Sequence, residues 1–584
     1  MAALSPRPLL LAALPLLAGA RWLPDAAGER FHVDAGGRIR DSKGRERLFH
    51  GTNIVYKVHP FHPAREADDW NAVDSFTASD LALLHEMGYN AIRLNAPWAA
   101  VEPFDRSPAA YNETFLDVVA GIVDEAGEYG IYSLIDHHQD AYSTAVCGTG
   151  FPSWTAANVS YGSPDVGVAE RVVYDALDLL RGNGREFPAP LHKSFSKQGR
   201  RIEDPERPGQ PNRTLCTTWN NNNFPAFHFA FQTAKSYEEI YDNAHGKRDR
   251  FAQYWRHLAR RFQKSRNVLG YELVNEPFAG DLYRYPWNMV PGAADRDRFQ
   301  RMYDVLANAI AAEDDHSLIF FQSVTWEVVL PIGEDFGFQH VPGGEGFRNR
   351  SVLSFHDSVF ATPDATYYNW RTAEMKRLGC AGAVTEIGSG NLPLVDTHRP
   401  IAGWMHWDYK LFGDWTWDNG GLFQGKRQSC REGALRCANA TEVRGYTRVY
   451  PIATAGTIRS LGFNWTTAVG WLEYEPLGCP TTAVSEAELF GGAASNRSFC
   501  PDPTVVFVPE RWYYADTGYQ VTLEPAGVAR YKSTTNYITV YHIAGAEGSI
   551  ATLQVGPRAS PAVAQAVHEK HVHEEHAEVV DVFV

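Results

Sequence analysis

Eight short apolar runs, each ending in polar residues, constrain the fold of this chain more than any other feature. Helix-like segments separate them, as where Phe115, Val119, Ile122 and Ala126 recur at helical spacing between the second and third runs. The runs are RLFHGTN (47–53), NAIRLN (90–95), IYSLID (131–136), VLGYELVN (268–275), SLIFFQ (317–322), SVLSFH (351–356), AGAVTEIG (381–388) and IAGWMHW (401–407). Eight strand–helix units predict an α/β fold, a (β/α)8 TIM barrel whose polar strand ends gather at one mouth.

The chain has 584 residues, which is too long for one ordinary domain. We assign residues 30–440 to the barrel, with an insertion at about 139–247 that is rich in Pro, Gly and charge and is expected to be a surface loop. Short alternating segments such as TVVFVPERWYY and YQVTLEP predict a β-sandwich domain over 445–558. The His- and Glu-rich residues 559–584 are expected to form a disordered, solvated tail rather than a metal site.

The N-terminus has the pattern of a secretory signal peptide. One arginine precedes an apolar run that starts at Leu9, and small residues end it at Ala20, so residues 1–20 are predicted to be cleaved. An uncleaved anchor is the alternative, although the run is short for a membrane span. No later segment reaches 18 apolar residues, and we therefore expect a soluble, secreted or secretory-pathway protein without stable membrane insertion.

The net charge of −15 argues against nucleic acid, because phosphate binding needs a basic surface. It argues equally against attraction to anionic lipids. A neutral sugar or a neutral lipid remains compatible with this charge.

Seven cysteines fit an oxidising compartment. Cys430 and Cys437 enclose a short polar loop, Cys479 and Cys500 enclose another, and each pair is expected to form a disulfide. Cys147 and Cys216 could pair across the insertion, which would leave Cys380 unpaired. There is no CxxC motif, which argues against zinc. Seven glycosylation sequons agree with a secreted glycoprotein, at Asn112, Asn158, Asn212, Asn349, Asn439, Asn464 and Asn496.

Two acids follow barrel strands in the same way, Glu276 in LVNEP and Glu386 in AVTEIG. Pro277 stops the strand, so Glu276 is expected at the rim of the mouth. Hydrolysis of a glycosidic bond uses two carboxyl groups, and a separation of about 5–5.5 Å predicts retention of configuration. The alternative is that each is an ordinary rim carboxylate in a salt bridge, and Glu102 in WAAVEP shows how common an isolated Glu-Pro pair is.

An ordered set of motifs resembles the endoglycoceramidases of glycoside hydrolase family 5, in clan A. The motifs are GTNIVYKVHP, GYNAIRLNAPWAAVEP, LIDHHQDAYS, GYELVNEPFAGD, GWMHWDYK and RVYPIATAG. The resemblance covers roughly residues 30 to 555 and implies a retaining mechanism that needs no metal and no organic cofactor. It implies that Glu276 is the general acid/base and Glu386 the nucleophile. It also implies that Asn275 bonds the sugar 2-hydroxyl and that Arg93 keeps the nucleophile ionised.

The same resemblance suggests five further substrate-binding residues. His138 and Asp140, in DHHQD, resemble a sugar-contacting pair, and His138 is favoured over its neighbour His137 because alternate residues of a strand face opposite ways. Lys57 resembles a sugar-hydroxyl ligand, with a solvated lysine as the alternative. Trp407 resembles an aromatic residue that stacks on the sugar, with a buried core tryptophan as the alternative. The fifth is the histidine of the sixth strand, His356.

The sequence departs from the family pattern after His356. Family 5 usually has a tyrosine two residues later, which bonds the nucleophile, whereas this chain has Asp357 and Ser358. Tyr367 or Tyr368 could substitute, or else the surroundings of the nucleophile are altered.

Three functions follow as hypotheses. The first is a retaining endo-β-glycosidase that cuts between oligosaccharide and ceramide in glycosphingolipids, with FPAFHFAFQ (224–232) as a candidate lipid groove or loop anchor. The second is a β-glucosidase acting on glucosylceramide or steryl glucosides, or a galactosyl-specific relative. The third is a catalytically silent glycolipid-binding protein. A lipid-presenting activator is a possible partner in the first two cases.

Overall fold

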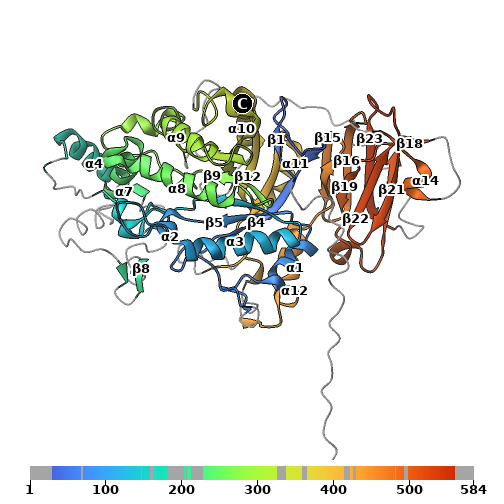
Figure 1. Ribbon diagram of the computed structural model, residues 1–584, viewed down its shortest axis with the longest axis horizontal. Helices are drawn as coiled ribbons and strands as arrows, with labels where there is room; N and C mark the ends of the chain where they lie inside the picture. Colours follow the sequence, from blue (N-terminus) through green and yellow to red (C-terminus); the bar gives the residue numbers. More distant parts are fainter. Residues whose placement is uncertain are drawn as a thin grey trace, which may run out of the picture.

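The structure is a computed structural model in which a barrel and a pair of antiparallel sheets lie side by side along the longest axis (Figure 1). It describes residues 29–66, 70–146, 148–157, 164, 166–180, 203–204, 207–211, 228–229, 231–324, 337–357, 365–412, 421–424, 429–479, 482–491 and 497–558. The expected signal peptide (1–20) and the expected tail (559–584) lie outside these residues.

The eight predicted barrel strands are all present, and they close into a barrel of parallel neighbours in the order β10-β11-β12-β13-β4-β5-β6-β9. Their bounds are β4 Phe49–Ile54, β5 Ala91–Asn95, β6 Tyr132–Asp136, β9 Val268–Glu272, β10 Leu318–Gln322, β11 Ser351–His356, β12 Ala381–Ile387 and β13 Ile401–His406. The prediction of a TIM barrel is therefore confirmed. Because all strands are parallel, their C-terminal ends meet at one face.

Helices surround this barrel. They are α1 Ala78–Glu86, α2 Trp98–Val101, α3 Glu113–Glu128, α8 Lys247–Phe262, α9 Gln300–Ala311, α10 Ala365–Leu378, α11 Leu392–Thr397, α12 Ala434–Cys437 and α13 Ala440–Tyr446. In α3 the four residues that predicted the helix, Phe115, Val119, Ile122 and Ala126, are all buried. Asn112 begins this helix by accepting a hydrogen bond from the Phe115 amide at 3.2 Å.

The described part of the insertion contains more regular structure than the surface loop predicted for 139–247. It includes α4 Val168–Leu180, the short strands β7 Glu203–Asp204 and β8 Arg207–Pro211, and α7 Phe231–Tyr241. Helix α7 is not on the surface: Phe231, Tyr237 and Ile240 are almost completely buried in the core of the barrel domain. Of the candidate groove FPAFHFAFQ, residues 224–227 and 230 lie outside the described part of the chain.

Two antiparallel sheets form the predicted C-terminal sandwich. One has the order β1-β2-β3-β14-β19-β22-β21 and the other β15-β16-β23-β20. The strands are β14 Tyr450–Thr454, β15 Gly456–Asn464, β16 Val469–Pro476, β19 Thr504–Phe507, β20 Tyr519–Glu524, β21 Ala529–Thr534, β22 Tyr537–His542 and β23 Ala551–Pro557, with β17 Val484–Ser485, α14 Glu486–Phe490 and β18 Ser498–Phe499 between β16 and β19. Leu461, Val506 and Leu553 belong to the apolar core of this domain.

The first three strands among the described residues belong to the seven-stranded sheet of the sandwich, which the division into consecutive domains did not predict. They are β1 His32–Val33, β2 Ile39–Arg40 and β3 Glu46–Arg47, and β3 pairs antiparallel with β14. Side chains strengthen the join: Arg40 donates to the carbonyl of Gly456 at 3.0 Å, and the carboxylate of Glu46 accepts from the Ile458 amide at 2.9 Å.

Both short-range disulfides are present, Cys430–Cys437 and Cys479–Cys500. Cys380 is buried as a free thiol, whereas Cys147 and Cys216 lie outside the described residues. In the described ranges, none of the helices combines the length and the apolar character that crossing a bilayer requires.

Candidate active site

The chain turns sharply where β9 ends, and this turn directs Glu276 into the mouth. Glu276 has a φ of +41°, in the left-handed region that a residue with a side chain enters at a cost of about 1–2 kcal/mol. Two glutamines hold the turn. Gln139 donates to the carbonyl oxygens of Asn275 (2.7 Å) and Glu276 (2.9 Å), and Gln322 accepts from the Glu276 amide (2.7 Å). The sequence analysis identified neither glutamine.

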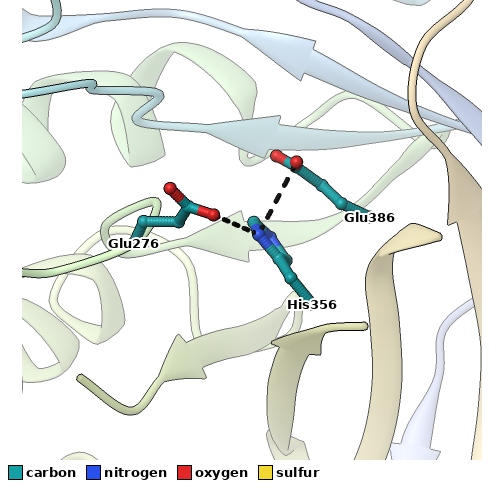
Figure 2. Close-up of side chains that lie close together, drawn as sticks. All are labelled: Glu276, His356 and Glu386. Carbon is teal, nitrogen blue, oxygen red and sulfur yellow. Dashed lines mark hydrogen bonds and ion pairs between the residues drawn. The ribbon is translucent and has the colours of Figure 1, made fainter. Parts of the chain in front are cut away.

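Glu276 and Glu386 approach each other across the mouth, as Figure 2 shows. One carboxylate oxygen of Glu276 lies within 4.8 Å of one carboxylate oxygen of Glu386, although β10 and β11 separate the strands that carry the two residues. His356 lies between them: its Nδ1 is 2.9 Å from Glu276 Oε1 and 3.6 Å from Glu386 Oε2. Carboxylate oxygens this close fall short of the roughly 6.5–9.5 Å of inverting glycosidases, which favours retention of configuration.

Arg93 organises the base of the site. It is completely buried at the middle of β5, where its Nη1 donates to Glu386 Oε1 at 2.9 Å and its Nη2 donates to Asn275 Oδ1 at 2.7 Å. Its Nε donates to Glu272 Oε2 at 2.5 Å. The planar guanidinium thus sets the orientation of Glu386 and of Asn275 at the same time.

Two buried acids that the sequence analysis did not identify support Arg93. Glu272 also accepts from the Thr385 hydroxyl at 3.1 Å, and Asp136 lies 3.1 Å from Arg93 Nη2. Both are 0% exposed and both belong to barrel strands. A charged residue inside an otherwise apolar strand was the available signal, since such a residue is rarely buried without a partner.

Asn275 has little freedom to rotate. Its Oδ1 accepts from Arg93, and its Nδ2 donates to the Gln139 carbonyl at 2.9 Å and lies 3.4 Å from His138 Nε2. The amide therefore keeps one orientation before a sugar arrives, which avoids the cost of ordering it on binding.

Lys57, Asp140, His138 and Trp407 form the other side of the mouth. Lys57 Nζ lies 2.8 Å from Asp140 Oδ2 and 4.8 Å from the centre of the Trp407 ring. His138 stacks on the same ring, with 5.4 Å between centroids and 12° between planes. Lys57 is 4% exposed, so it is not a solvated lysine. Because His138 is also 3.3 Å from Arg93, contacts connect all nine sequence-predicted catalytic and substrate-binding residues.

His137 faces away from this mouth, as the alternation of the strand predicts. Its Nδ1 accepts from the Trp98 amide at 3.2 Å, and its ring packs against Phe151 and Phe251. The favoured choice of His138 over His137 thus agrees with the geometry.

Burial raises the pKa of both Glu276 and Glu386. At Glu276 the negative charge of Asp140 adds to this rise, whereas at Glu386 the charges of His356 and Arg93 oppose it. Burial lowers the pKa of His356 to about 4, so this imidazole is neutral at neutral pH, and the positive charge in direct contact with Glu386 is that of Arg93. Contact with Arg93 thus favours the ionised form of Glu386, and the charge of Asp140 favours the protonated form of Glu276.

Glu276, His356 and Glu386 are also the three side chains whose spacing would suit a metal ion among the described residues. The guanidinium of Arg93, 2.9 Å from Glu386, already supplies a positive charge there. A cation between the carboxylates would be repelled by it.

The two tyrosines that could replace the family's tyrosine have other partners. Tyr367 donates to the His356 carbonyl at 3.1 Å, and Tyr368 donates to Asp357 Oδ2 at 3.0 Å. Both hydroxyls therefore support the end of β11. Ser358, at the position of the family's tyrosine, lies outside the described residues.

Asp140→Asn is expected to shift the alkaline side of the pH profile. Burial lowers the pKa of His138, but Asp140 and Asp136 outweigh burial and raise the pKa to about 9. Since the raised pKa belongs to a histidine, its charge and the stability it contributes are complete below about 6.5 and disappear as the pH rises through about 9. Without Asp140 this loss should begin ~1 pH unit lower or more.

The measurement is KM and thermal stability from pH 6 to pH 10. Asp117→Asn is the matched control, because Asp117 is an exposed acid paired with Arg261 outside the mouth. Identical alkaline limits for the Asp140 variant and the wild type would contradict the pairing of Asp140 with His138.

Comparison with known families agrees with this geometry. The profile of Cellulase (glycosyl hydrolase family 5) matches residues 57–165 and 220–417, and that of the glycoside hydrolase family 5 C-terminal domain matches residues 448–555. An endoglycoceramidase of Hydra vulgaris is 33% identical over 458 residues, which cover 75% of this chain and 76% of that protein. An endoglycoceramidase of Cyanea nozakii is 32% identical over 524 residues, which cover 86% of this chain and 89% of that protein.

Solved structures show the same fold. Endo-glycoceramidase II from Rhodococcus sp., in its ganglioside GM3 complex, superimposes with a TM-score of 0.59 at 18% sequence identity. The superposition covers 89% of this chain and 99% of the Rhodococcus chain. The barrel and the C-terminal sheets are thus found together in both proteins.

Proposed function

Since this chain belongs to glycoside hydrolase family 5, we propose that it is a retaining endo-β-glycosidase that hydrolyses the bond between oligosaccharide and ceramide in glycosphingolipids. The observation that carries the proposal is the approach of the Glu276 and Glu386 carboxylates to within 4.8 Å, above Arg93. Relatives described as endoglycoceramidases that span most of the chain support the choice of substrate.

The proposed reaction has two steps. Glu386 attacks the anomeric carbon, the bond to the ceramide oxygen breaks, and Glu276 gives its proton to that oxygen. Glu276, now ionised, then takes a proton from a water molecule whose oxygen attacks the same carbon. The sugar is released, and Glu386 and Glu276 return to their starting states.

The remaining residues act on the sugar in this proposal. Asn275 bonds the 2-hydroxyl, and this bond strengthens as the ring approaches an oxocarbenium ion. Lys57, Asp140 and His138 bind other hydroxyl groups, and Trp407 offers an aromatic face to the ring.

The described residues enclose a cavity of about 880 Å³ that is lined by none of the nine catalytic and substrate-binding residues. Its lining includes His59, Gly150 and Trp154. It adjoins the loops of Lys57 and Asp140, since the Thr149 hydroxyl donates to the Lys57 carbonyl at 2.7 Å.

The products of purified enzyme with lactosylceramide, glucosylceramide and a steryl glucoside test this proposal. We expect intact lactose and ceramide from the first substrate and little turnover of the others. Release of monosaccharide alone would favour the β-glucosidase hypothesis or its galactosyl-specific form. Sugar binding without any turnover would favour the hypothesis of a catalytically silent glycolipid-binding protein.

Two disulfides and the exposed sequons support a place in the secretory pathway. Asn112, Asn349 and Asn464 are exposed, so a glycan could be attached at each. A cleaved signal peptide and a lipid-presenting activator protein remain predictions, which the N-terminal sequence of secreted protein and assays with and without detergent would test.

A further inference from the structure

An indole ring lies against the outer face of the four-stranded sheet of the C-terminal domain. Trp471 of β16 is 40% exposed, whereas the next residue, Leu472, belongs to the apolar core. The benzene half of the ring covers Gly462 of β15, because a Cβ atom at that glycine would overlap Cζ2 and Cη2 of the indole. The indole Nε1 donates to the Ser460 hydroxyl at 3.3 Å. A single exposed aromatic residue is common on protein surfaces, but this one is held down on the sheet and presents its other side to solvent.

A glycosylation sequon lies on the same face of the sheet. Asn464 of β15 begins the sequence Asn-Trp-Thr. In the antiparallel register of β15 and β16, Gly462 is opposite Trp471 and Asn464 is opposite Val469. Since alternate residues of a strand share a face, Asn464 and Trp471 are diagonal neighbours on the outer face, roughly 7–8 Å apart. One sugar ring spans a gap of this size.

The side chain of Asn464 is oriented for this attachment. Asn464 is exposed, and its Oδ1 accepts from the amides of Thr466 and Thr467, each at 3.0 Å. Both bonds use the oxygen of the amide. An N-linked sugar is attached to the nitrogen, so the bonds that orient the side chain are compatible with a glycan.

We propose that an N-linked glycan on Asn464 packs its first sugar rings on the exposed side of Trp471. A pyranose has a face of C–H groups, and the negative face of an indole attracts them. Gln554 lies opposite Trp471 on β23, and Thr522 lies opposite Gln554 on β20, so polar side chains that suit sugar hydroxyls follow the indole across the sheet. Because the glycan is tethered beside the ring, its effective concentration there exceeds that of a free sugar. The inference rests on the proposed passage through the secretory pathway and not on the reaction at the mouth of the barrel.

Oxidative footprinting of the full-length protein, secreted from mammalian cells, tests this contact. Mass spectrometry reads both the occupancy of Asn464 and the rate at which Trp471 is oxidised. We expect Asn464 to carry a glycan, and Trp471 to be oxidised severalfold more slowly in the wild type than in Asn464→Gln. Asn349→Gln is the matched control, because it removes an exposed sequon asparagine of the barrel domain. Trp287, which is 52% exposed in the barrel domain, should be oxidised at the same rate in all three proteins.

A second variant separates the glycan from the asparagine side chain. Thr466→Ala abolishes the sequon while it keeps Asn464 and the backbone amide that bonds it, and it should expose Trp471 as Asn464→Gln does. Equal oxidation of Trp471 with and without the glycan, or equal exposure by Asn349→Gln, would overturn the contact. Glycans on other sequons but none on Asn464 would refute this site alone, whereas secreted protein without any glycan would also contradict the glycoprotein prediction.

Discussion

Glu386→Gln is expected to lower kcat for a glycosphingolipid on the order of 10⁴-fold, since it removes the carboxylate that attacks the anomeric carbon in the proposed mechanism. Glu276→Gln should lower it by roughly 10³-fold, because only proton transfer is lost. The two variants should differ on a lactoside with an acidic leaving group, which needs no proton to depart. Glu276→Gln should still form the glycosyl-enzyme there, visible as a burst of leaving group, and Glu386→Gln should not.

Glu102→Gln serves as the control for losing a buried glutamate followed by proline. Glu102 accepts from Trp98 Nε1 at 2.9 Å and pairs with Arg250, away from the other two acids. Its loss should affect stability while the rate per folded molecule stays within about threefold. A near-normal rate for either Glu276→Gln or Glu386→Gln would contradict the double-displacement mechanism.

Arg93→Met should cost more stability than any other single change in the mouth. Its loss leaves Glu272 and Glu386 buried without the guanidinium and leaves Asp136 with His138, and removing one partner of a buried ion pair costs about 3–5 kcal/mol. We also expect kcat/KM to fall by about 10²-fold or more, because Glu386 and Asn275 lose their common support.

The stability loss should depend on pH with a defined sign. Burial alone would raise the pKa of Glu272, but in the wild type Arg93 outweighs it and the pKa is lowered. Glu272 therefore contributes stability above its unfolded pKa of about 4.3. Without Arg93 the buried acids become protonated more readily, so the difference in free energy of unfolding should be larger at pH 7.5 than at pH 4.5.

Urea unfolding at both pH values measures this difference. Arg350→Met is the control, because Arg350 is a buried arginine that donates to the backbone carbonyls of Ser317 and Asp314. It should lose stability without a comparable loss of activity. A pH-independent effect of Arg93→Met would contradict the role of charge in this network.

The sequence predicted those parts of the molecule that leave a local pattern. The eight barrel strands were found because each is an apolar run of strand length between helices, and Glu276 and Glu386 because each ends such a run. Both short-range disulfides enclose short loops. The strand before Asn275 was predicted to reach 275 but ends at Glu272, since the sharp turn at Glu276 begins earlier.

The missed features depend on contacts between distant segments. Gln139 and Gln322 hold the turn at Glu276 from two other strand ends, and nothing near either glutamine in the sequence indicates this. Glu272 accepts a hydrogen bond from Arg93, and the sequence around Glu272 does not indicate this contact because Arg93 lies far away in the chain. Helix α7 was hidden in an insertion whose composition resembles that of a loop.

The pairing of β3 with β14 has a consequence for how this protein can be made. Strand β3 is synthesised long before β14, so it lacks this antiparallel partner until residues 450–454 are made. A chain cut between barrel and sandwich would therefore carry an unsatisfied strand edge, open to pairing with other chains. Because β3 and β14 join the two parts of the chain, we expect neither part to be stable when it is expressed alone.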